Sequence, residues 1–266
     1  MNILFLGDVT GRSGREAVLK RLPSLKQEVQ ADFTIVNGEN SAHGKGITSR
    51  ICHSLTAAGA DVITLGNHAF SKNEILLHME ECPDLIRPAN LEPLDRGSAV
   101  TVRTVKGKRL AVVNLLGSVF MDCATESPIT VMDRILKNLS ADIIFVDLHA
   151  EATSEKELFF YVFHDRLTAV IGTHTHVQTA DEQILDGCAY LSDAGMCGSY
   201  HSILGRDVNE VIARSVHQEA TRYTPSEEPA MICGVLITID ESTNRAIAIR
   251  RIQERPKVAP LSRTVF

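Results

Sequence analysis

Short apolar runs rich in β-branched residues alternate with longer segments of helical pattern through most of the chain. NILFLG, ADFTIVNG, DVITLG, RLAVVNLLG, ADIIFVDLH, TAVIGTH and AYLSDAG have the length and composition of buried strands. The helices predicted between them span residues 13–30, 48–59, 73–81, 128–139 and 154–163. This alternation is typical of an α/β layered fold with a mainly parallel sheet in the first half of the chain.

Two segments depart from the alternation and are predicted to form antiparallel hairpins. One pairs AMICGVLITID with RAIAIRRIQ across ESTN, and the other is AVTVRTVKGKRLAVVNLLG, with its turn at Lys106-Gly107-Lys108. Ser154 stands three residues before Glu157, which predicts a capping box at the start of the last helix. No repeat or linker divides the sequence. We therefore expect residues 1–266 to form a single domain, an α/β sandwich of two packed mixed β-sheets flanked by helices.

Composition excludes several classes of protein. The net charge is −6, and no block of like charges occurs along the sequence. These features argue against stable nucleic-acid binding but allow a small phosphorylated ligand. No apolar run approaches the roughly 20 residues that cross a bilayer, and MNILFLGDVTG lacks the basic start of a signal peptide. The six cysteines form no CxxC pair and are expected to be reduced core thiols. We expect a cytoplasmic protein without a membrane partner, and a homo-oligomer is compatible with the sequence.

Polar side chains that can bind metals follow five of the predicted strands. In open α/β sheets the carboxyl ends of parallel strands meet at one edge, where ligands bind. Carboxylate, amide and imidazole donors together suit Fe, Mn, Zn or Co better than a soft metal or Ca²⁺. The donors at these strand ends are Asp8, Glu39, Asn40, Asn67, His149, His174 and His176.

Seven donors exceed the needs of one tetrahedral zinc and fit two metal ions that share a carboxylate. Such a pair can hold a hydroxide that attacks a phosphoryl group. His68, beside the candidate ligand Asn67, would then be free to protonate the leaving oxygen. His174 and His176 are two apart, so on an extended segment both would face the cluster and Thr175 would face away.

Each of these residues also has a purely structural interpretation. Asp8 and Thr10 could cap a helix that begins near Ser13. Residues 39–40 and 67–68 could be polar turns, and His149 could be a hydrogen-bonded core histidine. The joint occurrence at five strand ends favours the metal site. Several loop residues could contact a phosphorylated substrate or be ordinary exposed side chains, namely Arg12, His43, Lys45, Tyr200 and His201.

The motifs GDVTG, NGEN, GNH, LH and GTHTH, in this order, resemble those of the calcineurin-like metallophosphoesterases. Two departures are visible: the usual Asp-x-His reads Asp8-Val9-Thr10, and Glu39 replaces the bridging aspartate. These changes are similar to those of the bacterial YmdB-like branch. GITSRICHSLTAAGADVITLGNH and SDAGMCGSY…LGRD extend the similarity over nearly the whole chain.

The resemblance implies a two-sheet sandwich and two metal ions bridged by Glu39, with iron as the expected metal and Mn or Zn as alternatives. It implies that Asn40 stands in for the missing histidine of the first motif. The implied ligands are Asp8, Asn40 and His176 for one metal, and Asn67, His149 and His174 for the other.

His68 falls on the position of the general acid, although Ala69 and Phe70 follow it instead of an acidic residue that would orient it. The implied activity is a phosphodiesterase acting on 2′,3′-cyclic nucleotides. A phosphomonoesterase with the same chemistry is one alternative. A non-catalytic nucleotide-binding regulatory protein is another, with phosphate on helix N-termini. GDVTGRSG supports that alternative weakly, because the GxGxxG spacing is absent.

Overall fold

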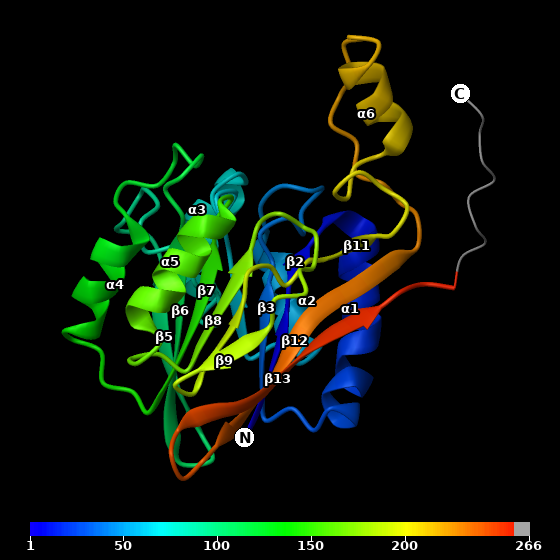
Figure 1. Ribbon diagram of the computed structural model, residues 1–266. Helices are drawn as coiled ribbons and strands as arrows, with labels where there is room; N and C mark the ends of the chain where they lie inside the picture. Colours follow the sequence, from blue (N-terminus) through cyan, green and yellow to red (C-terminus); the bar gives the residue numbers. More distant parts are fainter. Residues whose placement is uncertain (258–266) are drawn as a thin grey trace.

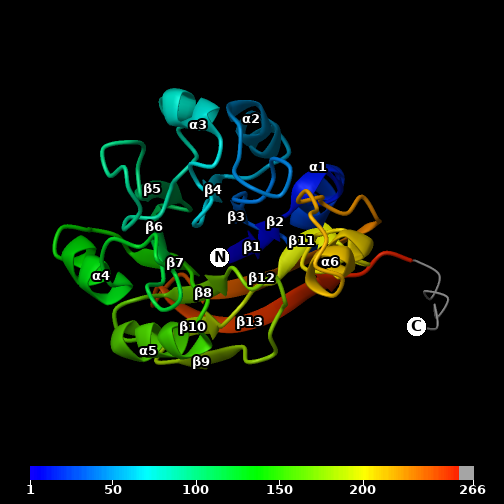
Figure 2. The ribbon, with the colours of Figure 1, turned by 90° about the horizontal axis from the view of Figure 1, so that it is seen from above.

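The computed structural model describes residues 1–257, and its two mixed β-sheets pack face to face between helices (Figures 1 and 2). The first sheet has the order β2-β11-β12-β1-β3-β4, with β13 beside β12. Its strands are β1 (Asn2–Leu6), β2 (Asp8–Val9), β3 (Phe33–Asn37), β4 (Val62–Thr64), β11 (Met196–Ser199), β12 (Ala230–Asp240) and β13 (Arg245–Glu254). The predicted α/β fold with two packed mixed sheets is confirmed.

The second sheet has the order β5-β6-β7-β8-β10-β9. Its strands are β5 (Val100–Val105), β6 (Lys108–Leu116), β7 (Ile143–His149), β8 (Ala169–Thr173), β9 (Gln183–Leu185) and β10 (Cys188–Leu191). The helices are α1 (Gly11–Glu28), α2 (Ser49–Ala57), α3 (Asn73–His78), the 3₁₀ helix η1 (Met79–Glu81), α4 (Pro128–Leu136), α5 (Thr153–Phe163) and α6 (Val208–Ser215).

The core between the sheets forms because alternate residues of each strand face the opposite sheet. Phe5 of β1 and Phe145 of β7 meet there with ring centroids 5.3 Å apart. Helices cover part of the outer face of each sheet, as in the stacking of Phe160 of α5 on Tyr190 of β10 at 4.5 Å. On the first sheet α1 lies so close to β11 that a Cβ on Gly14 would come within 1.9 Å of the Cys197 carbonyl. Because both faces of β1, β3, β7 and β8 are buried, these strands are mostly apolar.

Both predicted hairpins are confirmed, as β5–β6 and β12–β13 pair antiparallel. The predicted capping box is wrong: α5 begins at Thr153, one residue early, so Ser154 lies inside the first turn and no side chain caps the helix. Glu155 instead accepts hydrogen bonds from the backbone N–H groups of Ser118 and Val119. The short elements β2, β9, β11 and α6 were not predicted, because their local pattern is too brief to identify.

Parallel pairing brings the strand ends of the site to one edge of the molecule. β1, β3 and β4 run parallel in the first sheet, and β6, β7 and β8 run parallel in the second. Residues 200–229, which we call the arm, carry α6 and extend beyond this edge (Figure 1). Within residues 1–257 no helix has both the length and the apolar character needed to cross a bilayer.

Candidate metal centre

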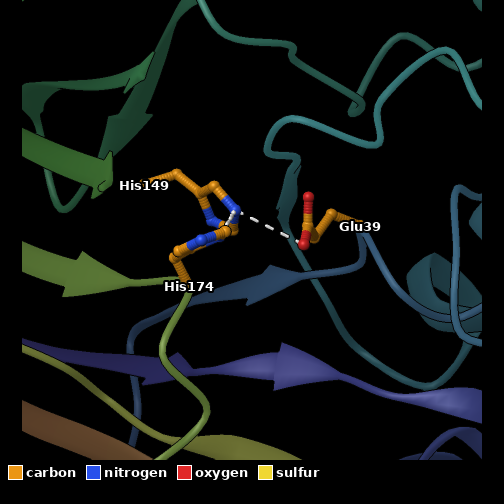
Figure 3. A group of neighbouring side chains, drawn as sticks. All are labelled: Glu39, His149 and His174. Carbon is orange, nitrogen blue, oxygen red and sulfur yellow. Dashed lines mark hydrogen bonds and ion pairs between the residues drawn. The ribbon is translucent and has the colours of Figure 1, made fainter. Parts of the chain in front are cut away.

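All seven predicted donors come together at the shared edge of the two sheets. Ligand atoms of Glu39, His149 and His174 lie within 4.8 Å of one another (Figure 3), and so do those of Asp8, Glu39 and His176. Glu39 belongs to both groups. Asp8, Glu39, Asn40 and His149 are buried, and Asn67, His174 and His176 are partly buried.

The first group is centred on Nε2 of His149. This atom lies 3.0 Å from Oδ1 of Asn67, 3.0 Å from Nδ1 of His174 and 3.4 Å from Oε1 of Glu39. The glycine of the LGNH motif makes this approach possible, because a Cβ on Gly66 would lie 2.3 Å from both Glu39 and His149. Glu39 and His149 can therefore face one another only across a residue without a side chain.

The second group joins Asp8, Asn40 and His176 around the other side of Glu39. Nδ2 of Asn40 lies 2.7 Å from Oε1 of Glu39 and 3.0 Å from Nε2 of His176. Oδ1 of Asp8 and Oδ1 of Asn40 are buried and accept no hydrogen bond from the described residues. Buried oxygens are rarely left without a partner, so this donor set fits a bound cation.

Each of the three imidazoles holds an acceptor with the ring nitrogen that faces away from the centre. Nδ1 of His176 lies 3.1 Å from the carbonyl oxygen of Leu204, and Nε2 of His174 lies 3.0 Å from a carboxylate oxygen of Glu151. Both oxygens can only accept, so the proton is on the outward nitrogen. The inward nitrogens of His174 and His176 therefore present lone pairs to the centre.

His149 is oriented in the same way by a buried chain of hydrogen bonds. The Thr173 hydroxyl donates to Oδ1 of Asp147 at 2.7 Å and lies 2.9 Å from Nδ1 of His149. Because the hydroxyl has one proton, it must accept from Nδ1–H of His149. Asp147 also accepts from Asn37 at 2.9 Å and from Thr64. Asp147 was not predicted as a site residue, because it follows an ordinary apolar run and has no local signal of its role.

The turn that carries His174 and His176 is not an extended segment, which corrects the prediction. β8 ends at Thr173, and His174 and His176 have φ values of 103° and 67°. Thr175 lines the pocket instead of facing away, and its N–H donates to Asp193 at 3.0 Å. The two histidines reach the centre because the backbone is left-handed at both, a conformation that a non-glycine residue keeps only when its surroundings impose it.

A buried ion pair holds this turn in place. Nζ of Lys156 on α5 lies 3.0 Å from Oδ2 of Asp193, the oxygen that also accepts from Thr175, and both side chains are 1% exposed. Oδ1 of Asp193 accepts from the N–H of Gly195 at 2.9 Å. Neither charged residue was singled out from the sequence, because 37 residues separate them.

The charges of the centre favour a positive group at its middle. Burial alone lowers the pKa of His149, but the carboxylates of Glu39 and Asp8 outweigh burial and raise it to about 9. Burial and the charge of His149 lower the pKa of His174 to about 3. Burial opposes ionisation of Glu39, yet His149 and His68 lower its pKa to about 2. Near neutral pH the proton on His149 therefore occupies a place that suits a cation.

His68 lies at the rim of the same centre and lines a pocket of about 270 Å³. Its backbone N–H donates to Oε2 of Glu39 at 3.1 Å, and its Nδ1 lies 3.5 Å from the Ser71 hydroxyl. Ser71 thus occupies the orienting position for which the sequence offered no acidic residue. Burial, together with the charge of Lys45, lowers the pKa of His68.

Only one of the weaker candidates for substrate contact lines the pocket. Lys45 lines the pocket, together with Glu151, Leu204 and Tyr223, which the sequence analysis did not identify. The remaining loop candidates lie outside the pocket lining: Arg12, His43, Tyr200 and His201.

The structure also tests the alternative role of Asp8 and the expectation for the cysteines. Asp8 is not a helix cap, because it lies in β2 and its Oδ2 accepts from the N–H of His174 at 3.2 Å. All six cysteines are free thiols, but Cys123 is exposed, contrary to the expectation of core positions throughout.

Known proteins match this chain over nearly its full length. A family model described as YmdB-like protein matches residues 4–252. The chain belongs to the YmdB-like family. It is 45% identical over 255 residues to a Bacillus subtilis (strain 168) protein named 2′,3′-cyclic-nucleotide 2′-phosphodiesterase, covering 95% of this chain and 96% of that one. The resemblance to the YmdB-like branch is therefore confirmed.

Solved structures show the same relationship. A hypothetical protein from Thermus thermophilus superposes with a TM-score of 0.90 at 36% identity, covering 96% of this chain and 100% of that one. A structure described as a novel phosphatase from Mycoplasma pneumoniae also has a TM-score of 0.90, at 35% identity, covering 95% and 92%. The YmdB-like chain shares its two-sheet fold with both.

The buried ion pair leads to a prediction about stability. Replacing Lys156 by Met leaves the Asp193 carboxylate buried without its cation, which should lower the free energy of unfolding by about 3–5 kcal/mol. Urea unfolding of chelator-treated protein, followed by circular dichroism, measures this change. The exposed Lys137→Met variant should stay within about 0.5 kcal/mol of the unchanged protein. Equal stability of the two variants would show that the pair does not hold the turn.

Proposed function

We propose that this chain is a dimetal phosphodiesterase that hydrolyses 2′,3′-cyclic nucleotides, with iron in the centre. One observation carries the proposal: ligand atoms of Glu39, His149 and His174 converge in one group and those of Asp8, Glu39 and His176 in a second, and Glu39 belongs to both. Mixed nitrogen and oxygen donors suit iron, manganese or zinc. The name of the Bacillus subtilis relative supports the substrate class.

The proposed ligands divide into two sets around one shared carboxylate. Glu39 would bridge, since it belongs to both groups of converging atoms. The remaining ligands would be Asp8, Asn40 and His176 for one metal, and Asn67, His149 and His174 for the other. When bound, two metal ions at such a site supply Lewis acidity toward the phosphoryl group and lower the pKa of water.

The chain's own residues would then orient the substrate and move a proton. His68 is placed to hold a proton on Nε2, the ring nitrogen away from Ser71, and to donate it to the ribose oxygen that leaves phosphorus. The backbone N–H of His68 donates a hydrogen bond to Glu39, and this bond keeps His68 beside the centre. Thr173, Glu151 and the Leu204 carbonyl keep the three ligand imidazoles in the required tautomers.

Replacing His68 tests this proposal. Purified protein with Fe²⁺ or Mn²⁺ should convert 2′,3′-cyclic AMP to a nucleoside monophosphate, with much slower hydrolysis of AMP. His68→Asn should retain its metals and lose about 10²–10⁴-fold in kcat on the cyclic nucleotide, since the ribose oxygen is a poor leaving group. The loss should be small on bis(p-nitrophenyl) phosphate, whose leaving group needs no proton.

The exposed His53→Asn variant is the matched control and should keep full activity. A wild-type protein that hydrolyses AMP but no cyclic nucleotide would make it a monoesterase. Absence of any phosphoester hydrolysis in the presence of bound metal would disprove the enzymatic function. Equal losses in the His68 and His53 variants would remove the role of general acid.

Metal binding should also release a proton. The pKa of His149 is raised to about 9 in the metal-free protein, so its Nε2 is protonated at pH 7.5 and must lose that proton to become a ligand. We expect about one proton released per chain, and metal affinity that rises about tenfold per pH unit from pH 7 to 9. Calorimetric titration of chelator-treated protein with Mn²⁺, in buffers of different ionisation enthalpy, measures both quantities. Affinity independent of pH in this range would contradict the assignment.

A further inference from the structure

Lys45 is the one residue of the described pocket lining that has a lysine or arginine charge. It lies in a closed turn just after Glu39 and Asn40. The N–H of Ala42 donates to the carbonyl of Gly46 at 2.8 Å, and the N–H of Lys45 donates to the carbonyl of Ala42 at 3.3 Å. The backbone is left-handed at the two glycines that flank Lys45, with φ values of 79° at Gly44 and 78° at Gly46. The turn thus fixes the backbone from which Lys45 reaches the pocket.

The Lys45 ammonium has no carboxylate partner among the described residues, although Glu39 and Glu151 line the same pocket. Its Nζ instead lies 5.4 Å from the ring centroid of Tyr223, within the range of a cation–π contact. The Lys45 side chain is exposed, so its charge lies beside the Tyr223 ring without being neutralised by a carboxylate. A lysine charge kept unpaired beside a centre of metal donors is suited to an anion.

Tyr223 belongs to the arm and also contacts a second cation. The guanidinium carbon of Arg206 lies 4.9 Å from its ring centroid, and Arg206 forms two hydrogen bonds of 2.7 Å with the Glu210 carboxylate. Glu210 also accepts from the Thr221 hydroxyl at 2.6 Å. The contact between Tyr223 and the turn requires a glycine, because a Cβ on Gly44 would lie 2.6 Å from the Tyr223 hydroxyl oxygen.

The arm thus reaches the site at two points. Its Leu204 carbonyl accepts from His176, and its Tyr223 ring faces Lys45. We propose that Lys45 binds a non-bridging phosphoryl oxygen of the substrate and that Tyr223 is the positioning residue that holds Lys45 for this contact. The inference rests on the proposed function, and it names the recognition of the phosphoryl group at that same site. It also gives the arm a role in substrate binding.

Removing the charge tests the role of Lys45. Lys45→Met should raise the KM for 2′,3′-cyclic AMP and the dissociation constant for inorganic phosphate by about 10- to 100-fold, the worth of one charge-assisted hydrogen bond. Lys45→Arg should recover part of the affinity, because it keeps the charge. The exposed Lys20→Met is the matched control and should leave both constants unchanged. Metal content should be the same in all variants.

A double-mutant cycle tests the role of Tyr223. Tyr223→Leu should raise the KM by about 3- to 10-fold when Lys45 is present and have little effect in the Lys45→Met background, while Tyr223→Phe keeps the ring and the KM. Additive losses would show that Tyr223 acts independently of Lys45. A merely structural role would lower stability in both backgrounds alike.

The outcomes separate this inference from the proposed function. Unchanged KM and phosphate affinity in Lys45→Met, with metals retained, would overturn the inference while the activity stands. If the unsubstituted protein hydrolyses no cyclic nucleotide, the proposed function fails. Calorimetric titration with inorganic phosphate then decides the role of Lys45 by itself.

Discussion

The buried carboxylate of Asp147 connects the two sheets at the edge where the site is built. It accepts from Asn37 of β3 and Thr64 of β4 in the first sheet, and from Thr173 of β8 in the second. Through Thr173 it also sets the tautomer of His149. One residue therefore fixes the relative position of four strand ends and the direction of a central lone pair. In a sandwich whose sheets meet mainly through apolar side chains, this network supplies directional contacts that packing alone lacks.

The arrangement of the imidazoles follows from the same principle of outward support. His149, His174 and His176 are held by a hydroxyl, a carboxylate and a backbone carbonyl, each from a different part of the chain. Within the centre, Nε2 of His149 lies 3.0 Å from Nδ1 of His174, and the raised pKa of His149 keeps a proton on Nε2 that this second imidazole accepts. A metal ion bound there would replace this proton, so we expect metal binding and proton release at this edge to be linked.

The sequence was sufficient to predict the layered fold and to select the seven donors, because strand ends and their polar residues are local features. It was insufficient for the groups that orient those donors. Asp147, Glu151 and the Lys156–Asp193 pair act across the fold and carry no pattern in their own neighbourhood. The left-handed backbone at His174 and His176 was missed for the same reason, since the buried ion pair that holds the turn is assembled only in the folded chain.

We propose above all that one carboxylate, Glu39, would be shared by two metal ions. Anomalous diffraction from crystals of protein purified without chelator, and loaded with Fe²⁺ or Mn²⁺, tests it most directly. We predict two metal peaks about 3.5–4 Å apart, each within bonding distance of an oxygen of Glu39. A single peak, or two peaks with Glu39 bound to neither or only one, would contradict the account.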